Sequence, residues 1–353
     1  MSRRRWIMIG LVGVAVPLGA LGLWAVGQAR RATAHLQAAL TAAVPGLTIQ
    51  SVTTAGLWPT TLIARGVTVA NPTGFTSAHA VSLPSVRLTY SPWLWIVGRV
   101  LVVDLELESP AVILERDVEW RANLQVLWEA ARSRARRYGG APVGLATLRL
   151  VPRRVVVTDG RFDLIDRRLK PEGVLLPVRA LTIRLEADLS GLRRETAVLG
   201  IRGHFVDRAG EPVGDVAFDS RFFAKDRGAT VDIRFAHRRL AELQPYLRLP
   251  YEIAEGDGTA DVHGRVDAER IRCDVTLVAR RLVLHGEAPL QGVLIQEVLG
   301  GLRDSEGVIT LAFEVAGRWG DPSFNFHDGL VQQLERTMRQ RLAEQGIVFE
   351  ETP

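Results

Sequence analysis

Alternating apolar and polar residues recur through the second half of the chain, and this two-residue period constrains the fold more than any other feature. In Leu181–Leu189, apolar residues alternate with threonine, arginine, glutamate and aspartate. Because successive side chains of a β-strand point to opposite faces, such a segment gives a sheet one dry and one wet face. Turns with glycine, aspartate or proline separate the alternating segments, so we predict a mainly β, mostly antiparallel sheet.

The predicted dry face has a larger apolar area than the expected helices can cover. It comprises Leu181, Ile183, Leu185, Val216, Phe218, Phe222, Val231, Ile233, Phe235, Leu311, Phe313 and Val315. The expected helices are few and short, at 123–131, 238–247, 291–302 and from Asp328 onward. A sheet with one apolar face must cover it. We therefore predict an apolar groove lined by Ile183, Leu185, Phe218, Phe222, Ile233, Phe235, Leu311 and Phe313.

The N-terminal segment Trp6–Gly27 carries no charge and follows Arg3–Arg5. As a helix it would be about 33 Å long, enough to cross a hydrocarbon core of about 30 Å. The arginines favour a cytoplasmic N-terminus, so we predict a single-pass inner-membrane anchor with the body in the periplasm. A cleaved signal peptide is the alternative, but its apolar region would be shorter and Ala25–Gly27 is a poor cleavage match.

The remaining sequence suggests a division into regions. After the anchor at residues 1–28, we expect a β region at 29–131, a basic linker at 132–142 and a β-groove region at 143–327. Residues 328–353 form the C-terminal helix and tail, with Leu330, Leu334, Met338 and Leu342 as one apolar stripe.

Composition and motifs argue against several classes of function. The net charge of +5 is carried almost wholly by arginine, which fits either a GC-rich genome or contact with anionic lipid head groups. No nucleic-acid-binding motif, P-loop, nucleophile elbow or metal-binding histidine pair occurs. The one cysteine, Cys273, excludes an intramolecular disulfide and falls in a strand pattern. We therefore predict no enzymatic activity, no cofactor, no metal site and no nucleic-acid partner.

Asp159, Asp163 and Asp166 are the only acidic cluster that suggests a metal site. We interpret them as residues of a solvent-facing turn and strand edge.

Ordered motifs give the chain a resemblance to a known family. Gly66–Phe75 contains Asn-Pro-Thr-Gly-Phe, Ser109–Arg116 precedes Asn123-Leu124, and Val155–Asp166 contains Asp-Gly-Arg-Phe-Asp. Near the end, Leu302–Ile309 is followed by Val315-Ala316-Gly317 and Asp321-Pro322-Ser323-Phe324. In this order the segments resemble the AsmA family of envelope proteins. Trp120 stands where that family often has glycine, and the chain is short for the family.

The resemblance implies inner-membrane anchoring and an elongated, bent β-sheet with an apolar groove, related to bridge-like lipid transfer proteins. It implies that the groove binds phospholipid acyl chains and serves outer-membrane lipid homeostasis, with a further envelope protein as partner. The alternative is a structural or adaptor protein of an envelope assembly or secretion apparatus, with a closed β-sandwich and no ligand. An open groove or a filled core would separate the two hypotheses.

Overall fold

The computed structural model describes residues 41, 44–56, 60–90, 100–119, 121–137, 149–167, 169, 173–188, 196–223, 228–247, 251–267, 270–286, 295–318 and 336–346. The predicted anchor, Trp6–Gly27, lies outside these residues. Within them, no helix is long and apolar enough to cross a membrane.

Within the described residues, the strands form one mixed, mostly antiparallel sheet of 13 strands. Its order is β1-β2-β3-β4-β6-β7-β8-β9-β10-β11-β12-β13, and β5 pairs with β3 and β6. The prediction of a mainly β, mostly antiparallel fold is confirmed. The described residues divide into two compact units, one within Met1–Leu107 and Asn123–Pro152, the other within Glu108–Ala122 and Arg153–Pro353.

The first unit contains the antiparallel strands β1 (Leu47–Ala55), β2 (Thr60–Ala70) and β3 (His79–Tyr90), together with β4 (Val100–Glu108) and the helix α3 (Asn123–Arg137). Helix α3 was predicted to end at Ala131, but it continues through the first part of the expected linker at 132–142.

Two of the motif segments meet in the first unit. The side chain of Asn123 is fully buried at the start of α3, and its Nδ2 donates a hydrogen bond of 2.8 Å to Oδ1 of Asn71. Asn123 Oδ1 also accepts a hydrogen bond from the backbone N–H of Leu124. The Asn-Pro turn after β2 is therefore tied to the beginning of α3.

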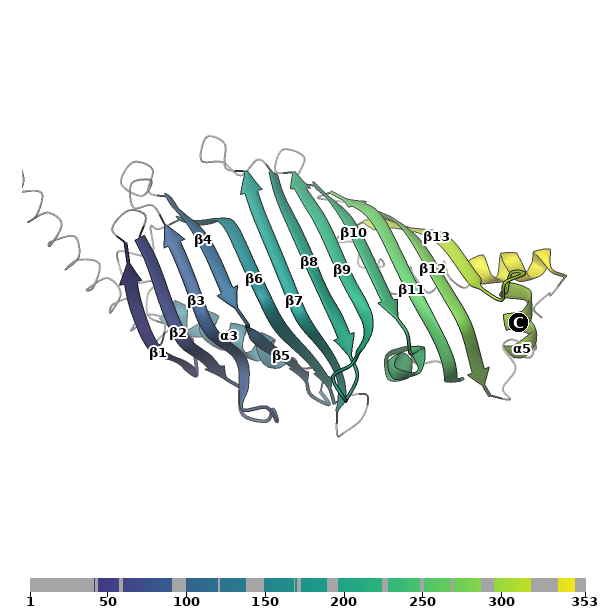
Figure 1. Ribbon diagram of the computed structural model, residues 1–353, viewed down its shortest axis with the longest axis horizontal. Helices are drawn as coiled ribbons and strands as arrows, with labels where there is room; N and C mark the ends of the chain where they lie inside the picture. The colour runs from purple at the N-terminus through teal and green to yellow at the C-terminus, as the bar shows by residue number, and fades with distance from the viewer. Residues whose placement is uncertain are drawn as a thin grey trace, which may run out of the picture. The chain divides into compact units, whose positions relative to one another are not determined.

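The second unit is a meander in which neighbours in sequence are neighbours in the sheet (Figure 1). Its strands are β5 (Ala111–Arg116), β6 (Arg149–Asp166), β7 (Val174–Asp188), β8 (Thr196–Val206), β9 (Pro212–Phe223), β10 (Gly228–His237), β11 (Glu252–Val266), β12 (Arg270–His285) and β13 (Ile309–Arg318). From β6 onward each strand is antiparallel to the next, whereas β5 is parallel to β6.

Two adjacent strands of this unit contain bulges. The β6–β7 register shifts around Gly160 and the β7–β8 register shifts between Arg179 and Thr182. Asp159 and Ala180 adopt positive φ values of 52° and 48° at these places. Positive φ is rare for residues with a Cβ atom, so these positions are fixed by the surrounding sheet.

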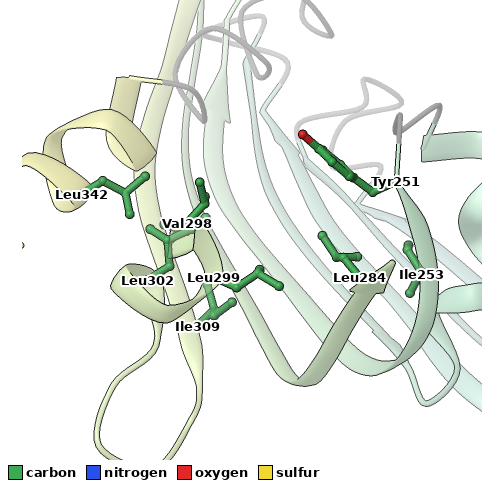
Figure 2. Packing of buried hydrophobic residues seen from close by; sticks show 9 residues of the cluster. Tyr251, Ile253, Leu284, Val298, Leu299, Leu302, Ile309 and Leu342 are labelled. Atoms are coloured by element: carbon green, nitrogen blue, oxygen red, sulfur yellow. The ribbon is translucent and has the colours of Figure 1, made fainter. Parts of the chain in front are cut away.

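Helices cover the apolar face at one end of this unit. The turn η2 (Leu240–Leu243) continues into α4 (Gln244–Leu247); α5 (Ile295–Leu302) and a C-terminal helix at 336–344 follow. Figure 2 shows Leu342 near Val298 and Leu302 in a cluster that also contains Tyr251, Ile253, Leu284, Leu299, Ile309 and Leu311. Met338 packs against this cluster, so the predicted apolar stripe is confirmed for Met338 and Leu342.

Candidate functional site

A row of apolar side chains runs across eight neighbouring strands of the second unit, and we call it the central row. Its members are directly opposite one another in register: Val157, Ile183, Ile201, Phe218, Ile233, Val262, Val275 and Phe313. Directly opposite residues of antiparallel strands project from the same face. The central row is therefore a continuous apolar band from β6 to β13.

The alternation predicted from the sequence is confirmed by burial. On β7, Ile183 and Leu185 are partly buried, whereas Thr182, Arg184 and Glu186 are exposed. The same contrast holds on β13, where Val315 is 1% exposed and the neighbouring Glu314 is exposed.

Burial is uneven along the central row. Val157 and Val275, near its two ends, are 5% and 2% exposed. Ile183, Phe218 and Ile233 in the middle are only partly buried. They belong to neither of the two buried clusters found among the described residues. Ile201, Val262 and, at the β13 end, Phe313 are also partly buried, so only Val157 and Val275 of the eight positions are fully covered.

The predicted groove residues all project from this one face, but their surroundings differ. Leu185 lies beside the central row, in register with Leu199. Phe235 packs edge-to-face on Phe205, with ring centroids 5.2 Å apart. Leu311 is 7% exposed and belongs to the cluster at the helix-covered end.

The prediction that Phe222 is buried on the dry face is wrong. We predicted a dry position, but its side chain is 40% exposed near the end of β9. It lies opposite Ala197 and Ala229, whose short side chains leave the ring uncovered.

Sequence reasoning missed Ile201, Leu199 and Val262, which belong to the same face. Glycines interrupt the alternation in their strands, at Gly200 on β8 and Gly264 on β11. The signal that could have found these residues is the alternation of the strands on either side, which fixes the face once the hairpin register is known.

The row next to the central row contains the chain's one cysteine. Cys273 is a free, buried thiol, and burial raises its pKa, with a smaller contribution from Asp274. It lies opposite Gly264, where an added Cβ atom would clash with the Cys273 sulfur. Glycine is therefore required beside Cys273. The arrangement is a packing contact, and Cys273 behaves as a small apolar residue.

His237 lies on the same face within an aromatic group. Its ring is 2% exposed and lies against Phe205 and Phe235, with centroid distances of 5.8 and 6.2 Å. Nδ1 accepts the backbone N–H of Arg239 at 3.2 Å. Burial lowers the pKa of His237, while Glu242, 3.9 Å from Nε2, opposes this effect. The ring is therefore a neutral part of the packing.

The opposite face of the sheet is charged, and many of its charges pair between adjacent strands. Arg234 Nε lies 2.8 Å from an Asp261 carboxylate oxygen, and His263 Nδ1 lies 2.7 Å from Asp232 Oδ1. Arg202 contacts Asp219 at 2.5 Å. These pairs surround a shallow hollow of about 200 Å³. The charged groups around this hollow are therefore paired with one another across neighbouring strands.

The aspartates considered as a metal site make separate contacts. Asp163 pairs with Arg179 at 2.5 Å, Asp166 is 3.5 Å from Arg116, and Asp159 accepts a hydrogen bond from Ser109. No group of three or more histidine, cysteine, aspartate or glutamate side chains in the described part of the chain is placed to hold a metal ion.

The apolar face of β6–β13 is accordingly the candidate functional site. Most of its described side chains are aliphatic or phenylalanine, and Cys273 and His237 pack among them. Comparisons with protein-family models, with curated proteins and with solved structures found no match to this chain.

Proposed function

We propose that the protein binds phospholipid acyl chains on the apolar face of β6–β13. The observation that carries the proposal is the central row, which is apolar on all eight strands yet only partly buried at Ile183, Phe218 and Ile233. Each methylene group that moves from water onto such a face gains about 0.8 kcal/mol. Two acyl chains contain many methylene groups, so a partly exposed apolar band of this kind favours lipid binding.

The chemistry of the face also suits movement of lipid. It is formed mostly by aliphatic and phenylalanine side chains, and the buried hydroxyl group of Ser220 donates to the carbonyl of Thr230 at 2.9 Å. Apolar contacts have no direction, so they hold tails without selecting one head group and let them slide along the row. We therefore propose that this face forms an apolar groove along the sheet, and that the protein transfers lipid along it.

The proposed setting is the bacterial envelope. The resemblance to the AsmA family and the apolar segment Trp6–Gly27 support an inner-membrane anchor, a periplasmic body and a contribution to outer-membrane lipid homeostasis. A reporter enzyme fused after Pro353 should be active only in the periplasm. Activity in the cytoplasm would contradict this topology.

Native mass spectrometry of the full chain, extracted in a mild detergent, tests lipid binding directly. The expected result is a set of masses that correspond to the protein with one or more phospholipids. Protein that carries no lipid, and takes none up from labelled vesicles, would contradict the proposal and favour the adaptor hypothesis. Fluorescent lipid transfer between vesicles then tests movement separately from binding.

A further inference from the structure

Five exposed arginines lie at one end of strands β9–β13, on the charged face of the sheet. This end contains the β9–β10 and β11–β12 hairpins and the last residues of β13 (Figure 1). The strand register places the five arginines in the last two rows of side chains on this face, and we call them the basic rim. Its members are Arg221, Arg265, Arg270, Arg272 and Arg318.

The basic rim contains two pairs of like charges. Arg265 on β11 is directly opposite Arg272 on β12, and Arg270 on β12 is directly opposite Arg318 on β13. Like charges in this arrangement destabilise a strand pair. Among the described residues, only Arg272 of the rim has an ion-pair partner, Glu314 at 3.3 Å, and 73% of the Arg272 side chain stays exposed. An anionic partner outside the chain would relieve the repulsion.

The row of side chains behind the basic rim has the opposite charge. On β9–β13 it consists of Asp219, Asp232, His263, Asp274 and Glu314. Asp232 pairs with His263 within this row, and Asp219 pairs with Arg202, which lies one row farther from the rim. Charge is therefore separated along the strands, positive at their end and negative behind it. Such a face is attracted to an anionic surface end-on and repelled when it lies flat.

The apolar face contributes an exposed ring at the same end. Phe222 follows Arg221 on β9, and its side chain is 40% exposed. Ala197 and Ala229, its directly opposite neighbours, are too short to cover the ring. Exposed aromatic rings beside basic residues are typical of surfaces that enter the head-group region of a membrane.

We propose that this end of β9–β13 docks end-on against an anionic phospholipid membrane. The guanidinium groups of the basic rim bind lipid phosphates, which their planar set of donors fits. Phe222 enters the head-group region, and the acidic row stays farther from the membrane. The inference rests on the proposed lipid function, to which it adds the contact that brings one end of the apolar face to a bilayer.

Vesicle capture tests the docking with the full chain held in nanodiscs of phosphatidylcholine. Vesicles of phosphatidylcholine and phosphatidylglycerol in equal parts should be captured, whereas vesicles of phosphatidylcholine alone should not. Arg265→Gln combined with Arg270→Gln removes one member of each like-charged pair. Capture should weaken about thirtyfold, because two arginines near an anionic surface are lost, and the unfolding midpoint should not fall.

A matched control removes the same charge from the other end of the strands. Arg208, in the β8–β9 hairpin, and Arg238, just after β10, are both exposed there. Arg208→Gln combined with Arg238→Gln should capture vesicles like the wild type. Equal capture by the rim variant and the wild type would overturn the proposal. An equal loss in the control, or capture of vesicles that contain only phosphatidylcholine, would overturn it as well.

An environment-sensitive dye attached at Phe222→Cys gives a second test. Cys273 is buried, so the introduced thiol reacts selectively in the native protein. Emission should rise when anionic vesicles are added, and the same dye at Ala209→Cys, exposed in the β8–β9 hairpin, should not respond. No response at Phe222→Cys, or equal responses at the two positions, would reject end-on docking.

Lipid bound per chain, measured by native mass spectrometry on the same variants, separates docking from the proposed function. Unchanged bound lipid in the Arg265 and Arg270 double variant, together with weakened capture, assigns the basic rim to docking. Loss of both would make the rim part of the lipid site and reject a separate docking surface. Capture of vesicles by a chain that carries no lipid would support docking and contradict the proposed function.

Discussion

Two members of the central row offer a direct comparison between a partly covered and a fully covered position. Ile233 on β10 is partly buried, and Val275 on β12 is 2% exposed. Both face the same way, and Val262 separates them in the row. We propose to replace each by aspartate in the full chain.

The expected losses in the free energy of unfolding differ by several kcal/mol between the two variants. A carboxylate at Val275 has no route to water and no partner, so the free energy of unfolding should fall by about 3–5 kcal/mol. At Ile233 the variant loses part of the about 1.5–3 kcal/mol from burying isoleucine, and its carboxylate stays solvated in the lipid-free protein. Because a domain is stable by about 5–15 kcal/mol, Val275→Asp should be close to unfolding while Ile233→Asp folds.

Lipid binding, in contrast to stability, should be strongly affected by Ile233→Asp. Acyl chains over Ile233→Asp would have to cover a charge, so affinity should fall more than about a hundredfold, which corresponds to about 2.7 kcal/mol. Denaturant unfolding and native mass spectrometry on the same preparations measure both effects. Val198→Asp, at a 44% exposed position on the opposite face, is the matched control and should change neither.

Our reasoning would be refuted if Ile233→Asp unfolded the protein as severely as Val275→Asp. That outcome would mean that protein covers the middle of the row, as in a closed sandwich. It would also be refuted if Ile233→Asp retained bound lipid at the wild-type level.

Further predictions follow from the buried polar groups. His237 has a lowered pKa, so the unfolded chain binds its proton first; stability should decline as the pH falls through about 6.5, and His237→Asn should flatten this decline in thermal melts. Asn123→Ala should lower the free energy of unfolding by about 1–3 kcal/mol in denaturant titrations, because it removes the hydrogen bond from fully buried Asn123 to Asn71. Cys273 should resist alkylation until denaturant unfolds the sheet, and rapid labelling of native protein would contradict its burial.

Strands β7, β9, β10, β12 and β13 were predictable because their alternation is clean, whereas glycines interrupt it in β8 and β11, which were not predicted. Ile183, Phe218, Ile233 and Phe313 were assigned to one face from the sequence, and the structure aligns them in one row. That they stand directly opposite one another depends on hairpin register. Loop lengths set the register, and the two-residue period does not encode it.

Other features were not predicted, for both local and long-range reasons. Helix α3 continues past Ala131 although its second half is a run of arginine and serine, because arginine and alanine are good helix formers. The exposure of Phe222 follows from the alanines beside it on neighbouring strands, and no local pattern indicates it. The pairing of Asn71 with Asn123 joins residues that are 52 positions apart.

The sequential strand order of β6–β13 has a consequence for how such a protein changes length over evolution. Each strand from β7 to β12 exchanges backbone hydrogen bonds only with the strands before and after it in the chain. Duplication or loss of one hairpin would widen or narrow the sheet by about 10 Å and leave every other register intact. A meander of this kind can therefore be fitted to a span by adding or removing hairpins, with the apolar row continuing through each new strand.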